Sequence, residues 1–128
     1  MRCLRLSDKG VLRWYTDCCR TPIGNTATSP LFPVIAVVHS FMVHGADGRS
    51  RDEVLGPPLC RIYERSAVRP LPPKAPAPPS LGVFASRASK IFGWWVLGLG
   101  QPSPLFDEHT NAPRAAPRVL TRNERAEL

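Results

Sequence analysis

The amino-acid sequence predicts an α+β protein in which a small antiparallel sheet is followed by a proline-rich linker and an amphipathic helix. Strand-forming segments alternate with turn residues in the first half of the chain, and six of the ten residues over 70–79 are proline. An apolar stripe with helical spacing follows residue 80. The predicted organisation is therefore a sheet domain over 1–69, a linker over 70–79, and a helix with a C-terminal tail over 80–128.

The sheet domain is expected to begin with two short strands. Residues 2–6 place Cys and Leu among arginines, and the Asp-Lys-Gly run over 8–10 is typical of a turn. Val11–Tyr15 combines β-branched, aromatic and leucine side chains, which favour a second strand. Residues 16–33 are rich in Thr, Ser, Pro, Gly and Asn, and this composition predicts a loop.

The strongest strand pattern lies over residues 34–43. Its nearly continuous valine, isoleucine and phenylalanine content is typical of a strand that is buried on both faces. The Gly-Ala-Asp-Gly run over 45–48 predicts a turn. The alternation over 59–64 predicts a last strand of the domain.

In the C-terminal zone, Ser80 is predicted to cap a helix that Gly98 and Pro102 terminate. The Thr-x-x-Glu spacing over 121–124 predicts the capping box of a short terminal helix. The apolar stripe of the long helix consists of Phe84, Ala88, Ile91, Phe92, Trp95 and Leu99.

The chain is basic, with a net charge of +7, and its cations comprise 14 arginines and three lysines. A basic balance favours anionic partners on encounter. The arginines are spread along the chain, however, and no zinc-finger or RNA-binding motif accompanies them. We therefore expect no specific nucleic-acid partner.

The cysteines indicate a reducing compartment. Charged residues interrupt Met1–Leu6 before any signal-peptide core forms, and the longest apolar run, Ile91–Gly100, is too short to span a membrane. A cytoplasmic location is expected, with Cys3 and Cys60 as buried thiols rather than disulfide partners.

Cys18 and Cys19 are the candidate metal ligands. Zinc sites usually draw on Cys-x-x-Cys pairs, because that spacing directs two thiolates at one ion, whereas adjacent cysteines tend to diverge. His39, His44 or Cys60 could complete a site, but no spacing requires it. The alternative is a turn with one buried and one exposed thiol. A reactive thiol is a further possibility, because neighbouring arginines such as Arg13 and Arg20 can lower a cysteine pKa.

The run Arg13–Ile23 resembles the knuckle of the glutathione-dependent formaldehyde-activating family, whose pattern is Arg-x-Phe-Cys-x-x-Cys-Gly-Thr-x-Leu. Cys19 and Thr21 fall on the second Cys and the Thr of that pattern, whereas Thr16 replaces the first Cys and Arg20 the Gly. A wider resemblance is to an uncharacterised bacterial branch of the same superfamily. It is carried by residues 4–15, 18–26, 93–95, 102–107 and 116–120.

This resemblance implies a zinc-bearing β-tent fold, of which the chain is similar to the C-terminal portion only. The family places further cysteine ligands upstream of the knuckle, so zinc is a possible cofactor with an incomplete site at Cys18 and Cys19. Cys19, at the family ligand position, is expected to be the more sheltered thiol. We therefore expect no self-sufficient enzyme. The alternative is a zinc-dependent carbon–sulfur lyase acting on a glutathione adduct, if the natural chain is longer.

The tryptophan-bearing helix offers a different function. An amphipathic helix with Phe92, Trp94 and Trp95 could lie on a membrane surface or bind a protein partner, and it could also mediate self-association. Packing of its apolar face on the sheet is the alternative that we favour, because Arg87 and Lys90 are the only cations within the helix.

Overall fold

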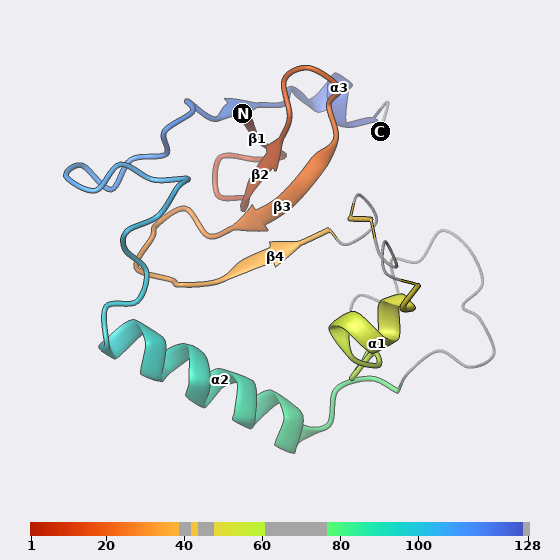
Figure 1. Cartoon of the computed structure of the whole chain (residues 1–128). Coiled ribbons are helices and arrows are strands. Elements are labelled where there is room, and N and C mark those ends of the chain that lie inside the picture. Colours follow the sequence, from red (N-terminus) through yellow and green to blue (C-terminus); the bar gives the residue numbers. More distant parts are fainter. Residues whose placement is uncertain (39–41, 44–47, 61–76, 127–128) are drawn as a thin grey trace. The chain divides into compact units, whose positions relative to one another are not determined.

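A computed structural model of the chain describes residues 1–38, 42–43, 48–60 and 77–126 (Figure 1). The chain divides into two compact units, one formed by residues 1–41 with 90–128 and the other by residues 42–89. Most of the predicted linker over 70–79 lies outside the described residues. The three-zone organisation therefore stays a prediction.

The first unit contains a five-stranded sheet, and the predicted α+β class is confirmed. The strand order is β4-β3-β2-β1-β5. The strands are β1 (Arg2–Arg5), β2 (Leu12–Tyr15), β3 (Pro22–Thr26), β4 (Ile35–Val37) and β5 (Arg118–Val119).

The sheet is mixed rather than wholly antiparallel as predicted. β1 to β4 are joined in sequence and pair antiparallel, whereas β5 comes from the C-terminal tail and runs parallel to β1, with Leu4 opposite Arg118. Only a distant segment can add a parallel strand, because a short turn reverses the chain. Figure 1 shows that this pairing brings β5, from the C-terminal tail, beside the N-terminal strand β1.

The helices are α1 (Arg51–Leu55), α2 (Leu81–Val96) and α3 (Arg122–Ala126). The predicted cap of α2 is confirmed, since the Val83 N–H donates to the hydroxyl of Ser80 at 3.3 Å. The predicted capping box of α3 is confirmed as well. The Thr121 N–H donates to the Glu124 carboxylate at 2.8 Å, and the Glu124 N–H donates to the Thr121 hydroxyl at 3.3 Å. α1 was not predicted.

One strand prediction and one loop prediction were wrong. Among the described residues of 34–43, only Ile35–Val37 form a strand, the edge strand β4, and its side chains are exposed rather than buried on both faces. β3 lies inside the stretch that was predicted to be loop. Leu59 and Cys60 are not in a strand, and the remainder of the predicted strand over 59–64 lies outside the described residues, as does most of the turn over 45–48.

The hydrophobic core lies on one face of the sheet. Cys3, Leu12 and Trp14 project from β1 and β2 and pack against Leu105 and Phe106 of the segment that follows α2. The rings of Trp14 and Phe106 meet edge to face at 6.1 Å. The Trp14 indole N–H donates to the hydroxyl of buried Thr26 at 2.9 Å, so the polar atom of this ring is satisfied inside the core.

At two glycines of this unit, another segment of the backbone approaches so closely that no side chain fits. A Cβ at Gly24 would lie 2.7 Å from the Ala36 carbonyl oxygen, where β3 meets β4. At Gly100 it would lie 1.9 Å from the carbonyl oxygen of Pro30. Both positions therefore exclude any side chain. At Gly100, the segment after α2 lies directly against the segment that precedes β4.

Candidate functional site

The connection between β2 and β3 is a tight turn over residues 16–21, which we call the knuckle. It is closed by two backbone hydrogen bonds, from the Thr16 N–H to the Thr21 carbonyl and from the Arg20 N–H to the Thr16 carbonyl, both at 3.0 Å. The Thr21 N–H also donates to the Thr16 hydroxyl at 3.0 Å. Arg20 has a φ of 56°, in the left-handed region where glycine is usual. Arg20 thus occupies a conformation that glycine, the residue at this place in the formaldehyde-activating pattern, would favour.

The knuckle surrounds the thiol of Cys19 with polar groups. The Cys19 Sγ lies 2.9 Å from the Thr16 hydroxyl and 3.0 Å from the Thr21 hydroxyl. The thiol of Cys18 donates to it across 3.7 Å. Thr16 stands where the formaldehyde-activating pattern has its first cysteine, and its hydroxyl oxygen lies close to the thiol of Cys19. From the sequence, Thr16 was interpreted only as the replacement of a cysteine ligand, and its contact with the Cys19 thiol was not predicted.

These contacts lower the pKa of Cys19 to about 6. The Thr16 hydroxyl contributes most, followed by the Thr21 hydroxyl, the Thr21 N–H and the Cys18 thiol. Each can donate to the thiolate, and a hydrogen bond to the charged form of a group favours that form. The arginines that we expected to lower a cysteine pKa are not among the causes.

Cys18 and Cys19 are both exposed, so the expected shelter of Cys19 is not confirmed. Their sulfur atoms do not diverge as expected, since they lie 3.7 Å apart. Two thiolates on one tetrahedral zinc ion, each at about 2.3 Å, are separated by about 3.8 Å. The pair therefore has the span of two neighbouring ligands of one ion.

A closed zinc site does not fit the described residues. No group of three or more His, Cys, Asp or Glu side chains comes together among them. Cys60 belongs to the other compact unit, and His39 and His44 lie outside the described residues. The knuckle offers two thiols and two hydroxyls, and the assignment of Cys18 and Cys19 as metal ligands stays a prediction.

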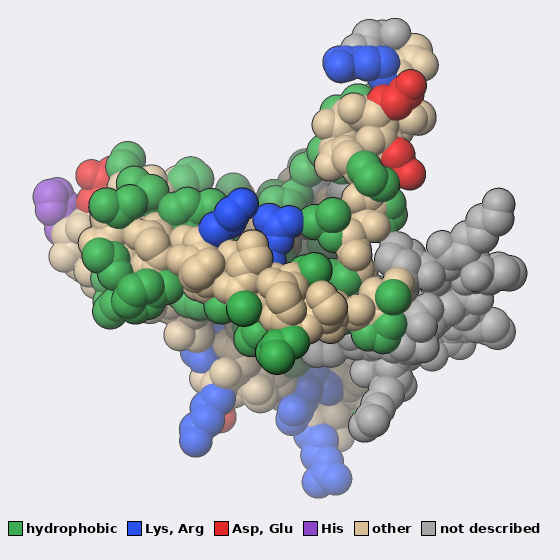
Figure 2. Space-filling model, turned by 90° about the horizontal axis from the view of Figure 1, so that it is seen from below, with side chains coloured by type: hydrophobic (Ala, Val, Ile, Leu, Met, Phe, Trp, Pro, Cys, Tyr) green, Lys and Arg blue, Asp and Glu red, His purple; other side chains and the backbone are tan. Residues whose placement is uncertain are grey.

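The second candidate region is α2, in which no residue is buried. Phe92, Trp94 and Trp95 have relative exposures of 62%, 43% and 51%, and the rings of Phe92 and Trp95 lie 5.7 Å apart. Figure 2 shows hydrophobic side chains reaching the surface along this helix. Within the described ranges, no helix is long and apolar enough to cross a membrane.

The comparisons with known proteins place the chain in one family. Residues 1–115 match the model of DUF6151, a family of unknown function, and the chain belongs to it. No curated protein and no solved structure matches the chain. The match provides no link to the formaldehyde-activating superfamily, so that relationship and the lyase alternative stay predictions.

Proposed function

We propose that this protein is a β-tent-related binding domain in which Cys18 and Cys19 act together as a two-donor ligand for a soft metal ion, without self-sufficient catalysis. The observation that carries the proposal is the 3.7 Å separation of the two sulfur atoms in an ordered turn. A donor pair held at the right span is preorganised, because the turn need not rearrange when the ion binds.

The two thiols cannot complete the coordination of a metal ion alone. A tetrahedral ion needs four donors, and the knuckle supplies two thiols. The remaining positions must be filled by water, by a small thiol or by donors from another chain. We therefore expect weak and exchangeable binding of zinc by this chain.

Metal titration tests the proposal. Cadmium binding to thiolates produces an ultraviolet charge-transfer band, which the full chain should show with one ion bound per chain and which dialysis should remove. Cys18→Ser and Cys19→Ser should each abolish the band, and the matched control Cys60→Ser should keep it.

Two results would overturn the proposal. A tightly held zinc ion that survives dialysis and depends on Cys18 or Cys19 would show a closed site. A band that persists in both knuckle variants but disappears in Cys60→Ser would place the ligands elsewhere.

A second candidate function rests on the exposure of the aromatic side chains of α2. Helices that present aromatic residues and cations bind at membrane surfaces, where the aromatic rings sit at the level of the headgroups. We propose that Phe92 and Trp95 let α2 lie on an anionic lipid surface, with Trp94 on the flank of the helix that carries Arg87 and Lys90. Arg87 and Lys90 would supply the attraction to the headgroups, at about 1 kcal/mol each.

Sedimentation with vesicles containing phosphatidylserine tests this second proposal. Phe92→Glu and Trp95→Glu should each reduce the fraction of protein that sediments with the vesicles. Ser86→Glu is the matched control, because it adds the same charge about opposite the apolar stripe of the helix. A chain that ignores the vesicles would refute the lipid proposal. Concentration-dependent self-association without vesicles, lost in Trp95→Glu, would assign the same surface to a second copy.

A further inference from the structure

The face of the sheet opposite the core carries a cleft of about 800 Å³. One row of directly opposed residues crosses it, from Arg118 on β5 through Leu4 on β1 and Arg13 on β2 to Asn25 on β3. Opposed residues of adjacent strands project to the same face of a sheet. Leu12 and Trp14 flank Arg13 in the sequence and project to the core instead.

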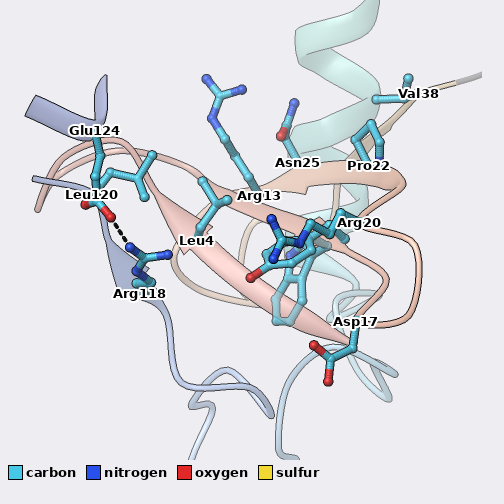
Figure 3. Close-up of a pocket in the computed structure, with 12 residues that line it drawn as sticks. Leu4, Arg13, Asp17, Arg20, Pro22, Asn25, Val38, Arg118, Leu120 and Glu124 are labelled. Carbon is cyan, nitrogen blue, oxygen red and sulfur yellow. Dashed lines mark hydrogen bonds and ion pairs between the residues drawn. The ribbon is translucent and has the colours of Figure 1, made fainter. Parts of the chain in front are cut away.

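Each end of the cleft carries an arginine and a carboxylate (Figure 3). At one end, Arg118 forms an ion pair with Glu124 of α3. At the other end lie Arg20 and Asp17 of the knuckle, and Asp17 pairs with Arg2 at 3.0 Å. Both carboxylates that line the cleft are thus already paired with an arginine.

Arg13 and Arg20 differ from Arg118, the third arginine that lines the cleft. Among the described residues, neither guanidinium has a hydrogen-bond or ion-pair partner, although both line the same cleft. Figure 3 shows Arg13 and Asn25 projecting to the same side of their strands. The floor of the cleft is less polar, because Leu4, Tyr15 and Leu120 also line it.

We infer that this cleft binds a small organic anion, in which a carboxylate or phosphate group is attached to an apolar or aromatic body. Guanidinium groups bind both kinds of anion through paired N–H donors. The leucine and tyrosine side chains provide the surface for the apolar part. The volume lies within the range of about 300–1,000 Å³ that is typical of small-molecule sites.

Nucleic acid fits this surface less well. Proteins bind the phosphate backbone by neutralising several phosphates, in strong cases about 6–10 of them, with lysine and arginine side chains. The cleft offers two guanidinium groups that other side chains do not already engage. A ligand with one or two negative charges is the better match for that number.

The experiment is a titration of the full, isotope-labelled chain, followed by ¹H–¹⁵N NMR. Phenyl phosphate and phenylacetate are the two anionic probes, and their relative affinities distinguish a phosphate from a carboxylate ligand. Benzyl alcohol, which carries no charge, reports the contribution of the ring alone. We expect saturable shifts at the amides of β1, β2, β3 and β5 for at least one anionic probe.

Arg13→Gln and Arg20→Gln should each weaken binding of that probe by about tenfold, since hydrogen bonds to charged groups are stronger than neutral ones. Lys9→Gln is the matched control, because it removes a charge from an exposed turn of the same unit outside the cleft. Circular dichroism verifies that each variant is folded. Cys19→Ser should bind the anion normally, so the result is independent of the proposed metal site.

Several outcomes would overturn the inference. One is that neither anionic probe saturates the chain at millimolar concentrations. Another is that Lys9→Gln weakens binding of the anionic probe as much as Arg13→Gln does. A third is that benzyl alcohol binds as tightly as the anionic probes. Tighter binding of a single-stranded oligonucleotide that is lost in the same arginine variants would replace the small anion by nucleic acid.

Discussion

The two faces of the sheet are formed by alternate residues of the same strands, but their environments differ. On β2, Leu12 and Trp14 are almost completely buried, whereas Arg13 between them is exposed. The buried face is covered by Leu105 and Phe106 from a segment without regular structure. We therefore assign stability to the covered face of the sheet and propose ligand binding at the open face. Each assignment can be tested by itself.

The largest expected effect separates the faces directly. Trp14→Ala should lower the free energy of unfolding by about 3–5 kcal/mol, because it leaves a cavity beside Phe106 and Leu105. The neighbouring Arg13→Ala should change it by less than about 0.5 kcal/mol, since it alters an exposed surface. Urea unfolding followed by far-ultraviolet circular dichroism measures both. Similar losses in the two variants would show that the open face also stabilises the fold.

A smaller effect is expected from Thr26, a buried polar residue whose hydroxyl accepts the hydrogen bond of the Trp14 indole N–H. Thr26→Val keeps the shape of the side chain but removes the acceptor of the indole N–H. A buried donor left without a partner costs about 1–3 kcal/mol. Thr28→Val, at an exposed position, is the matched control and should be nearly neutral. A neutral result for Thr26→Val would mean that water reaches the indole N–H and that the core is less closed than its burial indicates.

The elements that local patterns predicted are those that local interactions determine. β1, β2 and the caps of α2 and α3 depend on neighbouring residues, and their prediction was confirmed. β3 was missed because Pro22, Gly24 and Asn25 are typical of turns. Gly24 is required there by the backbone of β4, a contact that no local pattern records.

Features that depend on contacts between distant segments could not be predicted, because local sequence patterns do not record such contacts. The apolar residues of β4 were expected to be buried, but the strand lies at the edge of the sheet. Leu105 and Phe106 belong to the core although they follow two prolines in an irregular segment. The open face brings Arg118 beside Leu4 only through the parallel pairing of β5. The candidate thiols were predicted, whereas the role of the Thr16 hydroxyl depends on the closure of the knuckle.

Replacement of Arg20 by glycine tests whether one substitution can raise the stability of the chain and at the same time weaken ligand binding. A left-handed conformation costs a residue other than glycine about 1–2 kcal/mol, of which about 0.5–1 kcal/mol is offset by the greater chain entropy that glycine loses on folding. Arg20→Gly should therefore stabilise the chain by about 0.5–1 kcal/mol while weakening the binding of phenyl phosphate. Arg20→Gln, which keeps the backbone cost, should weaken binding without a change in stability. Stabilisation by both variants would attribute the effect to charge and not to conformation.

The smallest expected effect on stability concerns the thiol at the rim of the sheet. With its pKa lowered to about 6, Cys19 should react with iodoacetamide at a nearly constant rate above neutral pH and more slowly as the pH falls through 6. Thr16→Val should move this profile toward the ordinary cysteine value of about 8.5, and Thr21→Val should move it less, because the Thr21 N–H remains. Tandem mass spectrometry distinguishes modification of Cys19 from that of Cys18.

The same pKa fixes the sign of the linked change in stability. Because the folded-state pKa of Cys19 is lower than the unfolded one, ionisation stabilises the folded chain fully above the unfolded value and loses this contribution as the pH falls through about 6. The effect should be small, since the residue is exposed. Thr16→Ser retains the hydroxyl and should keep the labelling profile of the original chain. A profile that follows the ordinary cysteine value in the original chain, unchanged by Thr16→Val, would show that the hydroxyl contacts do not favour the thiolate in solution.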